Sequence, residues 1–230
     1  MSETTAAVPM ITGPYFESLL ARQSQQAVSP SAWLKALRAK AVERLGVLRL
    51  PTTRDEEWRF TDISPLSKTS FASALSATDL ESSDVAHLFI EEASTRLVFV
   101  DGIYALELSS PNAGIDTHSG AVVSNLTAAM AAHAAAMKPH LGRHAPFTQD
   151  AFAAQNTALL HDAVVIIVPR DATVAAPVHL LFIATQKDVV STPRCLVLAE
   201  AGSAVTVIED YVVLYQPRWQ EETHFTNAVT

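Results

Sequence analysis

The sequence predicts an α+β chain in which a mainly helical first part is followed by short β-strands. Apolar residues recur at helical spacing, with capping residues beside them, in much of the first 160 residues. After residue 160, runs of β-branched residues follow one another at short intervals. Because no helical pattern separates these later runs, a fold of alternating strands and helices is disfavoured.

The helices are predicted from spacing and from their ends. One helix face consists of four residues at helical spacing, namely Leu34, Leu37, Ala41 and Leu45. Ser29-Pro30 is expected to begin this helix, and Gly46 to end it in the left-handed conformation. A helical turn is expected from Arg54, because Thr53 and Glu56 have the spacing of a capping box. Further helices are expected over residues 15–20, 124–138 and 149–160.

The strands are predicted from β-branched runs bounded by turn residues. An early strand over residues 96–100 is expected to end in a turn at Asp101-Gly102, which gives a strand pair near 96–105. Later strands are expected over residues 164–168, 178–185, 195–198, 204–208, 211–215 and 224–230. Without a strict residue repeat, the periodicity leaves a sandwich, a barrel and a solenoid open.

Composition narrows the class of protein. The 230 residues carry 16 Lys and Arg against 24 Asp and Glu, a formal charge of −8, and 49% of them are apolar. Such a chain is globular rather than disordered, and its acidity disfavours binding to nucleic acid. With Cys195 as the one cysteine of the sequence, no internal disulfide can form, which fits a reducing compartment. We therefore expect a soluble intracellular protein.

No membrane contact is expected. Two stretches are free of charge, but residues 117–137 are interrupted by polar side chains and residues 172–186 are too few to cross a bilayer. The first residues also lack the basic segment of a secretory or transit peptide.

The eight histidines are the first candidates for a metal site or for acid–base chemistry. His133, His140 and His144 lie close together and Asp150 follows, and ligands on a helix are commonly four residues apart. Gly142 between the last two histidines argues against a regular helix, so surface histidines on a loop are the favoured interpretation. The histidines in or beside the later strands are expected to be structural, namely His161, His179 and His224.

The remaining chemical motifs favour a protein without catalytic activity. Cys195 precedes an apolar run, which predicts a buried and unreactive thiol. No phosphate-binding loop, nucleophile elbow or zinc-protease pattern occurs in the sequence. We predict no catalytic, cofactor-binding or metal-ligating residue in this chain.

The densest charged cluster spans residues 54–59, Arg-Asp-Glu-Glu-Trp-Arg. It is typical of a capped helical turn whose acidic residues lie near the positive end of the helix dipole. Trp58 and Phe60 are expected to anchor this turn to the core or to an interface. The alternative is that the paired Arg and Glu side chains bind a ligand, but no glycine-rich loop or metal-binding pattern near the cluster supports it.

This cluster carries a resemblance to a known family. Residues 50–62 resemble the segment P-T-x-K/R-x-E-x-W-R/K-Y/F-T of the SufB/SufD family, and of SufD in particular. Further segments resemble the family in the same order, over residues 97–104, 152–158, 168–180, 193–211 and 225–230. The resemblance covers roughly residues 30–230, with His161-Asp162-Ala163 where the family commonly has Asp-Gly.

The resemblance implies a fold, partners and a function. It implies an N-terminal mainly helical region over residues 1–160, followed over residues 161–230 by the first rungs of a right-handed parallel β-helix. It also implies a scaffold component of the SufBCD complex for iron–sulfur cluster assembly in a bacterial cytoplasm, with SufB and SufC as partners. The cluster and ATP would be handled by that complex, with ATP on the partner ATPase, and no cofactor would be bound by this chain.

Family members continue beyond the region that this chain resembles, so the chain is expected to correspond to their N-terminal part. The sequence stops inside the apolar strand expected over residues 224–230. Because an open strand edge recruits other strands, a homodimer through the C-terminal strands is a further expectation.

Two other classes of function remain open at this point. A β-solenoid enzyme acting on polysaccharide would need carboxylates clustered on one face of adjacent strands. The acids of the β region mostly flank strands instead, namely Asp171, Asp188, Glu200, Glu209 and Asp210. A free-standing protein-binding module is the third class.

Overall fold

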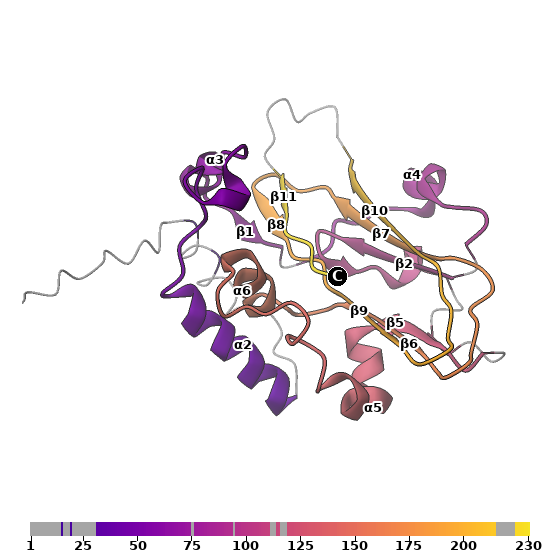
Figure 1. The fold of residues 1–230 in the computed structure, drawn as a ribbon. Helices are drawn as coiled ribbons and strands as arrows, with labels where there is room; N and C mark the ends of the chain where they lie inside the picture. Colours follow the sequence, from indigo (N-terminus) through magenta and orange to yellow (C-terminus); the bar gives the residue numbers. More distant parts are fainter. Residues whose placement is uncertain are drawn as a thin grey trace, which may run out of the picture.

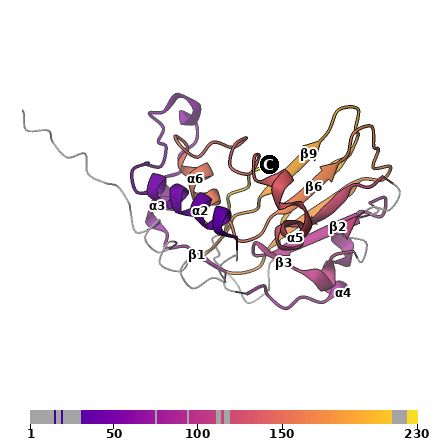
Figure 2. The same cartoon turned by 90° about the horizontal axis from the view of Figure 1, so that it is seen from below.

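A computed structural model describes residues 15, 19, 31–74, 76–93, 95–110, 114–115, 119–214 and 224–230 (Figure 1). Helices α2 (Ala32–Leu45), α3 (Ser64–Lys68) and α6 (Ala151–Ala158) lie on one side of the molecule, and most strands lie on the other (Figures 1 and 2). No helix of the described part is both long enough and apolar enough to cross a membrane.

Three sheets contain the described strands. The first has the order β10 (Val207–Val213), β7 (Val178–Ala184), β2 (Thr95–Val100) and β3 (Ile103–Tyr104). The second has the order β4 (Gly114–Ile115), β5 (Val122–Asn125), β6 (Val164–Val168) and β9 (Cys195–Ala199). The third has the order β1 (Ala72–Ser73), β8 (Val189–Ser191) and β11 (His224–Thr226).

The later strands pair in parallel at regular offsets. Strands β6, β7 and β8 lie beside β9, β10 and β11, with Val164 opposite Cys195 and Val178 opposite Val207. The apolar runs over residues 164–168, 178–184 and 195–199 are therefore strands, as the sequence predicts. Strand β10 begins at Val207, later than predicted, and continues through residues 211–213 without a break.

The expectation of a right-handed parallel β-helix is wrong, because two of the three sheets are mixed. Strand β5 pairs antiparallel with both β4 and β6, and β2 pairs antiparallel with β3. The physical reason is that β6 and β7 have edges that need partners, and residues before 160 supply them. Strand β2 covers β7 and β5 covers β6, so these sheets are neither purely parallel nor closed.

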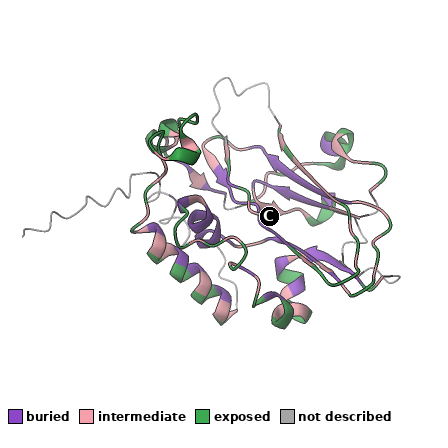
Figure 3. Cartoon of the chain, in the orientation of Figure 1, coloured by how far each residue is buried: buried purple, intermediate pink, exposed green. Residues whose placement is uncertain are grey.

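The main core lies between the two four-stranded sheets. Apolar side chains of β2 and β7 meet those of β5, β6 and β9, and Leu97, Val123, Ile166 and Leu180 are almost fully buried there. Figure 2 shows β6 and β9 in one layer and β2 and β3 in the other. The outer face of the β2–β7 sheet is covered by α4 (Ser82–Val85) and η2 (Ala86–Leu88), with Val85 fully buried against it. Buried residues accordingly concentrate along the strands in Figure 3.

The turn after β2 is fixed by a buried carboxylate. Asp101 and Gly102 have φ angles of 53° and 83°, and they form the turn predicted at this position. Asp101 accepts hydrogen bonds from the Thr185 backbone N–H (2.7 Å) and the Thr185 hydroxyl (2.6 Å). These bonds hold the end of β2 against the end of β7.

Helices α2 and α6 form a helical layer that packs against the sheet containing β8. Helix α2 packs against α6 through Ala41, Leu45 and Ala154, all fully buried. The described residues of the expected helix over 15–20 are Tyr15 and Leu19, which are both helical and buried in the same cluster. Ser29-Pro30 lies outside the described residues.

The end of α2 differs from the prediction. Gly46 has φ −64° and ψ −16°, because its N–H donates to the Val42 carbonyl and the chain continues in a right-handed turn. The predicted helices over 124–138 and 149–160 are confirmed as α5 (Leu126–Met137) and α6. Asn125 and Asp150 cap them, each accepting hydrogen bonds from N–H groups of the first turn.

Candidate functional site

The described surface contains a groove of about 1010 Å³. Three segments form its walls, residues 47–58, residues 145–153 and the C-terminal residues 227–230. The groove therefore lies where the helical layer meets the last described strand. Its first wall contains the segment that carries the family resemblance.

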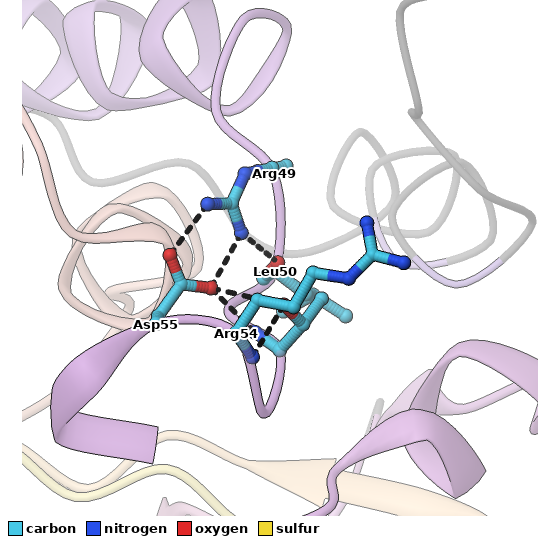
Figure 4. Close-up of polar contacts among 5 residues, drawn as sticks. Arg49, Leu50, Arg54 and Asp55 are labelled. Carbon is cyan, nitrogen blue, oxygen red and sulfur yellow. Dashed lines mark hydrogen bonds and ion pairs between the residues drawn. The ribbon is translucent and has the colours of Figure 1, made fainter. Parts of the chain in front are cut away.

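An ion pair shapes the first wall (Figure 4). Arg49 Nη1 donates to Asp55 Oδ2 (2.7 Å) and Arg49 Nη2 donates to Asp55 Oδ1 (2.5 Å), a bidentate arrangement. The Thr52 N–H also donates to Asp55 Oδ2 (2.7 Å), so the carboxylate closes the turn from residue 49 to residue 55. The hydrogen bond from Arg49 and the Thr52 N–H lower the pKa of Asp55, and the same carboxylate raises the pKa of Arg49.

The helical turn itself differs from the expected capping box. A 3₁₀ turn, η1 (Glu56–Trp58), replaces the helical turn expected from Arg54, and its N-cap is Asp55 rather than Thr53. Asp55 is committed to Arg49 and Thr52, and its side chain makes no cap bond. The charged segment is thus organised around Arg49, which lies outside the charged cluster of residues 54–59.

Trp58 and Phe60 play different parts. The half-buried Trp58 ring lies 5.4 Å from the Phe152 ring on α6, centroid to centroid, so Trp58 anchors the turn as expected. Phe60 is 89% exposed, and only the Arg59 guanidinium lies over it among the described side chains, 4.7 Å from the ring centroid. The expectation that Phe60 anchors the turn to the core is wrong, because two residues after Trp58 the side chain faces outward.

The groove is amphipathic and slightly acidic. Val47, Pro51 and Phe152 contribute apolar surface. Its ionisable side chains are Arg49, Asp55, Glu56, Glu57 and Asp150. With Arg49 and Asp55 neutralising each other, the remaining charge of the groove is negative. The described lining contains neither histidine nor cysteine.

A buried polar network joins the floor of the groove to the strands. The Asn227 side-chain amide donates to the Phe152 carbonyl (2.8 Å). The Asn156 amide donates to the carbonyls of Asn227 (2.6 Å) and Pro193 (2.8 Å). Both asparagines are almost completely buried. Neither asparagine is predicted as a site residue from the sequence, because the sequence around a buried asparagine does not differ from that around an exposed one.

The structure brings together two of the candidate histidines. His140 Nδ1 and His144 Nε2 lie 3.0 Å apart and the rings stack at 5.3 Å, on the turn after α5. His133 lies on α5, and Asp150 caps α6 instead of joining them. Among the described residues no group of three or more His, Cys, Asp or Glu side chains is arranged to hold a metal ion.

Two other histidines have structural surroundings. His179 is fully buried on β7, and its Nε2 lies 3.0 Å from Asp210 Oδ2 on β10. Burial lowers the pKa of His179, and Asp210 opposes that shift. Burial likewise lowers the pKa of His161. His224 begins β11.

Cys195 is buried, as its apolar context predicts. Burial, with a contribution from Glu209, raises the pKa of the thiol to about 12. The thiol is therefore protonated and unreactive at neutral pH.

The acids of the β region are engaged in local structure. Glu209 accepts hydrogen bonds from Tyr211 (2.6 Å) and Thr230 (2.9 Å), and Asp210 pairs with His179. Asp171 and Asp188 occupy turns with φ angles of 58° and 52°.

The structure is that of an α+β protein with mixed sheets and a groove between its helical layer and its last described strand. The N-terminal region of the SufBD proteins matches residues 15–180 of this sequence. An iron–sulfur cluster assembly SufBD family protein of Synechocystis sp. is 32% identical over 199 residues, which are 84% of this chain and 43% of that protein. The iron–sulfur cluster assembly protein SufD of Bacillus subtilis is 25% identical over 198 residues, 81% of this chain and 43% of that protein.

The chain belongs to the SufBD family. The resemblance drawn from residues 50–62 is thereby confirmed, including its SufD-like character. The chain spans less than half the length of the curated relatives that it matches.

Proposed function

We propose that this chain acts in iron–sulfur cluster assembly as a non-catalytic scaffold subunit of a SufBCD-type complex in a bacterial cytoplasm. Its partners would be SufB and the ATPase SufC. The observation that carries the proposal is membership of the SufBD family, whose curated relatives are named as iron–sulfur cluster assembly proteins.

The groove supports a scaffold role. A volume of about 1010 Å³ accommodates several side chains of a partner segment, and the walls offer apolar surface beside carboxylates. The bidentate Arg49–Asp55 pair holds one wall in place before a partner binds, which lowers the entropic cost of association. The negative charge left on Glu57 and Asp150 favours a partner segment that carries Lys or Arg.

The chemistry of the described side chains supports a subunit that holds no cluster of its own. Iron–sulfur clusters are held mainly by cysteine thiolates, and the thiol of Cys195 is buried and protonated. In this proposal ATP and the assembling cluster are bound elsewhere in the complex.

Co-purification from the native cell tests the proposal. The tagged protein, expressed at its natural level, is isolated from lysate, and its partners are identified by mass spectrometry. Recovery of SufB and SufC is expected. Recovery of neither protein refutes the proposal, with an unrelated partner pointing to a free-standing binding module and an empty eluate to a polysaccharide-acting enzyme.

A matched pair of charge reversals tests the part played by the groove. Glu57→Lys changes an exposed residue of the groove wall, and Glu43→Lys changes an exposed residue of α2 outside it. We expect Glu57→Lys to reduce the recovery of partners by about tenfold, as for a charge pair at an interface, and Glu43→Lys to leave it unchanged. Equal recovery with both variants would remove the groove from the interface.

A further inference from the structure

A second cavity lies next to the groove and has a different character. Its volume is about 140 Å³, several times the roughly 30 Å³ that one water occupies in the liquid. The turn after α5, the start of β9 and the last two residues of the chain enclose it. Its polar side chains are His140, His144, Arg194, Cys195 and Thr230.

The wall of this cavity contains a buried arginine without a carboxylate partner. Arg194 is 4% exposed, and Nη2 donates to the Thr157 hydroxyl (2.6 Å). Its Nε is buried and has no hydrogen-bond partner among the described residues. No carboxylate in the described part of the chain forms an ion pair with it.

Such an arginine is costly unless something compensates its charge. A guanidinium stays protonated in proteins, and a buried charge needs a counter-charge or hydrogen-bond acceptors. Burial lowers the pKa of Arg194 to about 10, which still leaves the group charged at neutral pH. Of five N–H donors on the guanidinium, one has a described acceptor that is a neutral hydroxyl.

Two histidines contribute further hydrogen-bonding groups to the cavity. His140 and His144 share a nitrogen–nitrogen contact of 3.0 Å, in which one ring donates to the other. Because one of the two facing nitrogens must lack a proton, the pair carries at most one positive charge. Among the described residues lining the cavity, none is acidic, although the whole chain has a formal charge of −8.

The turn that presents these histidines depends on one glycine. Gly142 has φ +81°, a conformation that residues with a Cβ rarely adopt. A Cβ at this position would also lie 2.9 Å from Leu37 Cδ1 on α2. The sequence thus holds His140 and His144 on the same side of the turn, over the end of β9.

We propose that this cavity binds a small oxyanion, such as inorganic phosphate or the phosphate group of a larger molecule, between Arg194 and the His140–His144 pair. Arginine recognises oxyanions with paired, charge-assisted hydrogen bonds, and an imidazole N–H adds a further donor. The volume admits a single tetrahedral group and little more within the enclosed part. The proposal does not depend on the role of the chain in cluster assembly.

Thermal unfolding of the 230-residue chain with added anion is the first test. Inorganic phosphate, sulfate and adenosine monophosphate are each titrated against potassium chloride at equal ionic strength. A ligand that binds the folded state raises Tm by about 3–6 °C at ten times its Kd for a chain of this size. Saturable stabilisation by phosphate or sulfate supports a site for the free ion, and stronger stabilisation by the nucleotide supports a site for a phosphate ester.

Matched histidine variants locate the site. His144→Ala removes an exposed side chain from the cavity, and His133→Ala removes a half-buried one from α5 outside it. We expect His144→Ala to weaken phosphate binding by about tenfold, the value of one charge-assisted hydrogen bond, and His133→Ala to leave it unchanged. Arg194→Gln is expected to abolish the stabilisation, and because it can also lower the basal Tm, the comparison is made on the shift caused by phosphate.

The proposal is overturned if none of the three anions raises Tm above potassium chloride. It is also overturned if His144→Ala, which leaves the buried Arg194–Thr157 bond intact, gives the same phosphate affinity as the wild-type chain.

Discussion

Replacing Asn156 by alanine is expected to lower the free energy of unfolding by about 2–4 kcal/mol. The fully buried Asn156 amide donates to the carbonyls of Pro193 (2.8 Å) and Asn227 (2.6 Å), and so joins α6 to two segments beside the strands. The Pro193 carbonyl keeps a second donor, the Val229 N–H at 3.0 Å, so loss of that bond costs about 0.5–1.5 kcal/mol. The Asn227 carbonyl has no second described donor, and leaving it unpaired adds about 1–3 kcal/mol.

The side-chain oxygen of Asn156 adds little to the expected loss of unfolding free energy. Asn156 Oδ1 has no hydrogen-bond partner among the described residues, so its removal forfeits no bond. For a chain of this size, the total corresponds to a fall in Tm of roughly 5–15 °C.

Urea unfolding followed by circular dichroism measures the change, with the slope of the transition checked for constancy. Ser67→Ala is the control, because that exposed hydroxyl makes one local hydrogen bond, to the Ser64 carbonyl (2.8 Å), and its loss is expected to cost about 0.5 kcal/mol or less. A loss below about 0.5 kcal/mol for Asn156→Ala, or one no greater than that of the control, would refute the reasoning.

The remaining predictions concern single side chains. Trp58→Ala is expected to lower the free energy of unfolding in urea by about 1–2 kcal/mol, because the ring is half-buried against Phe152. Phe60→Ala is expected to lower it by less than about 0.5 kcal/mol, because that side chain is 89% exposed. A larger loss for Phe60→Ala than for Trp58→Ala would contradict the role of Trp58 as the anchor. Asp55→Asn is expected to destabilise the chain at neutral pH. The pKa of the Asp55 carboxyl is lower in the folded than in the unfolded chain, so the difference in free energy of unfolding between the variant and the wild type shrinks as the pH falls below about 4. A difference that stays constant in urea unfolding at each pH would exclude this linkage. The Cys195 thiol, whose pKa burial raises to about 12, is expected to react with an aromatic disulfide reagent only after unfolding, and rapid labelling of the folded chain would show an accessible thiol. Val229→Lys is expected to weaken self-association through the C-terminal strands in sedimentation velocity, and a wild-type chain that stays monomeric at high concentration would contradict it.

Element types could be predicted from the sequence wherever the local pattern is long and clear. The apolar run from Val164 to Val168 has its predicted bounds, and the alanine-rich segment after Asn125 is the helix α5. Both patterns report on burial within one element, and burial is what periodicity measures.

The partners of the strands could not be predicted in the same way. Strand β5 (Val122–Asn125) is short and adjoins α5, so its residues read as the beginning of a helix. Its antiparallel pairing with β6 joins residues about forty positions apart, and this pairing makes the sheet mixed. Pairing depends on which edges remain open after the whole chain has folded, and no local pattern contains that information.

The two candidate surfaces also differ in how far they could be predicted from the sequence. The segment containing Trp58 stands out in the sequence because its charged and aromatic residues are contiguous, and it forms one wall of the groove. The oxyanion cavity combines a turn near residue 142 with Arg194, about fifty positions later. Arg194 reads in the sequence as an ordinary charged residue before a strand, and its function becomes visible only once its burial and lack of a carboxylate partner are known.

The two surfaces share a wall. Val229 and Thr230 line both the groove and the oxyanion cavity, and the Val229 N–H and carbonyl are bonded on either side of Arg194, to Pro193 and Cys195. A partner segment that shifts these two residues when it enters the groove must therefore change the cavity, and an anion in the cavity must change the groove by the same coupling free energy. If both proposals hold, phosphate alters the affinity of the chain for its partner, and the partner alters the affinity for phosphate by the same factor. An effect in one direction without the other would show that the two surfaces are independent and that the change arises from ionic strength.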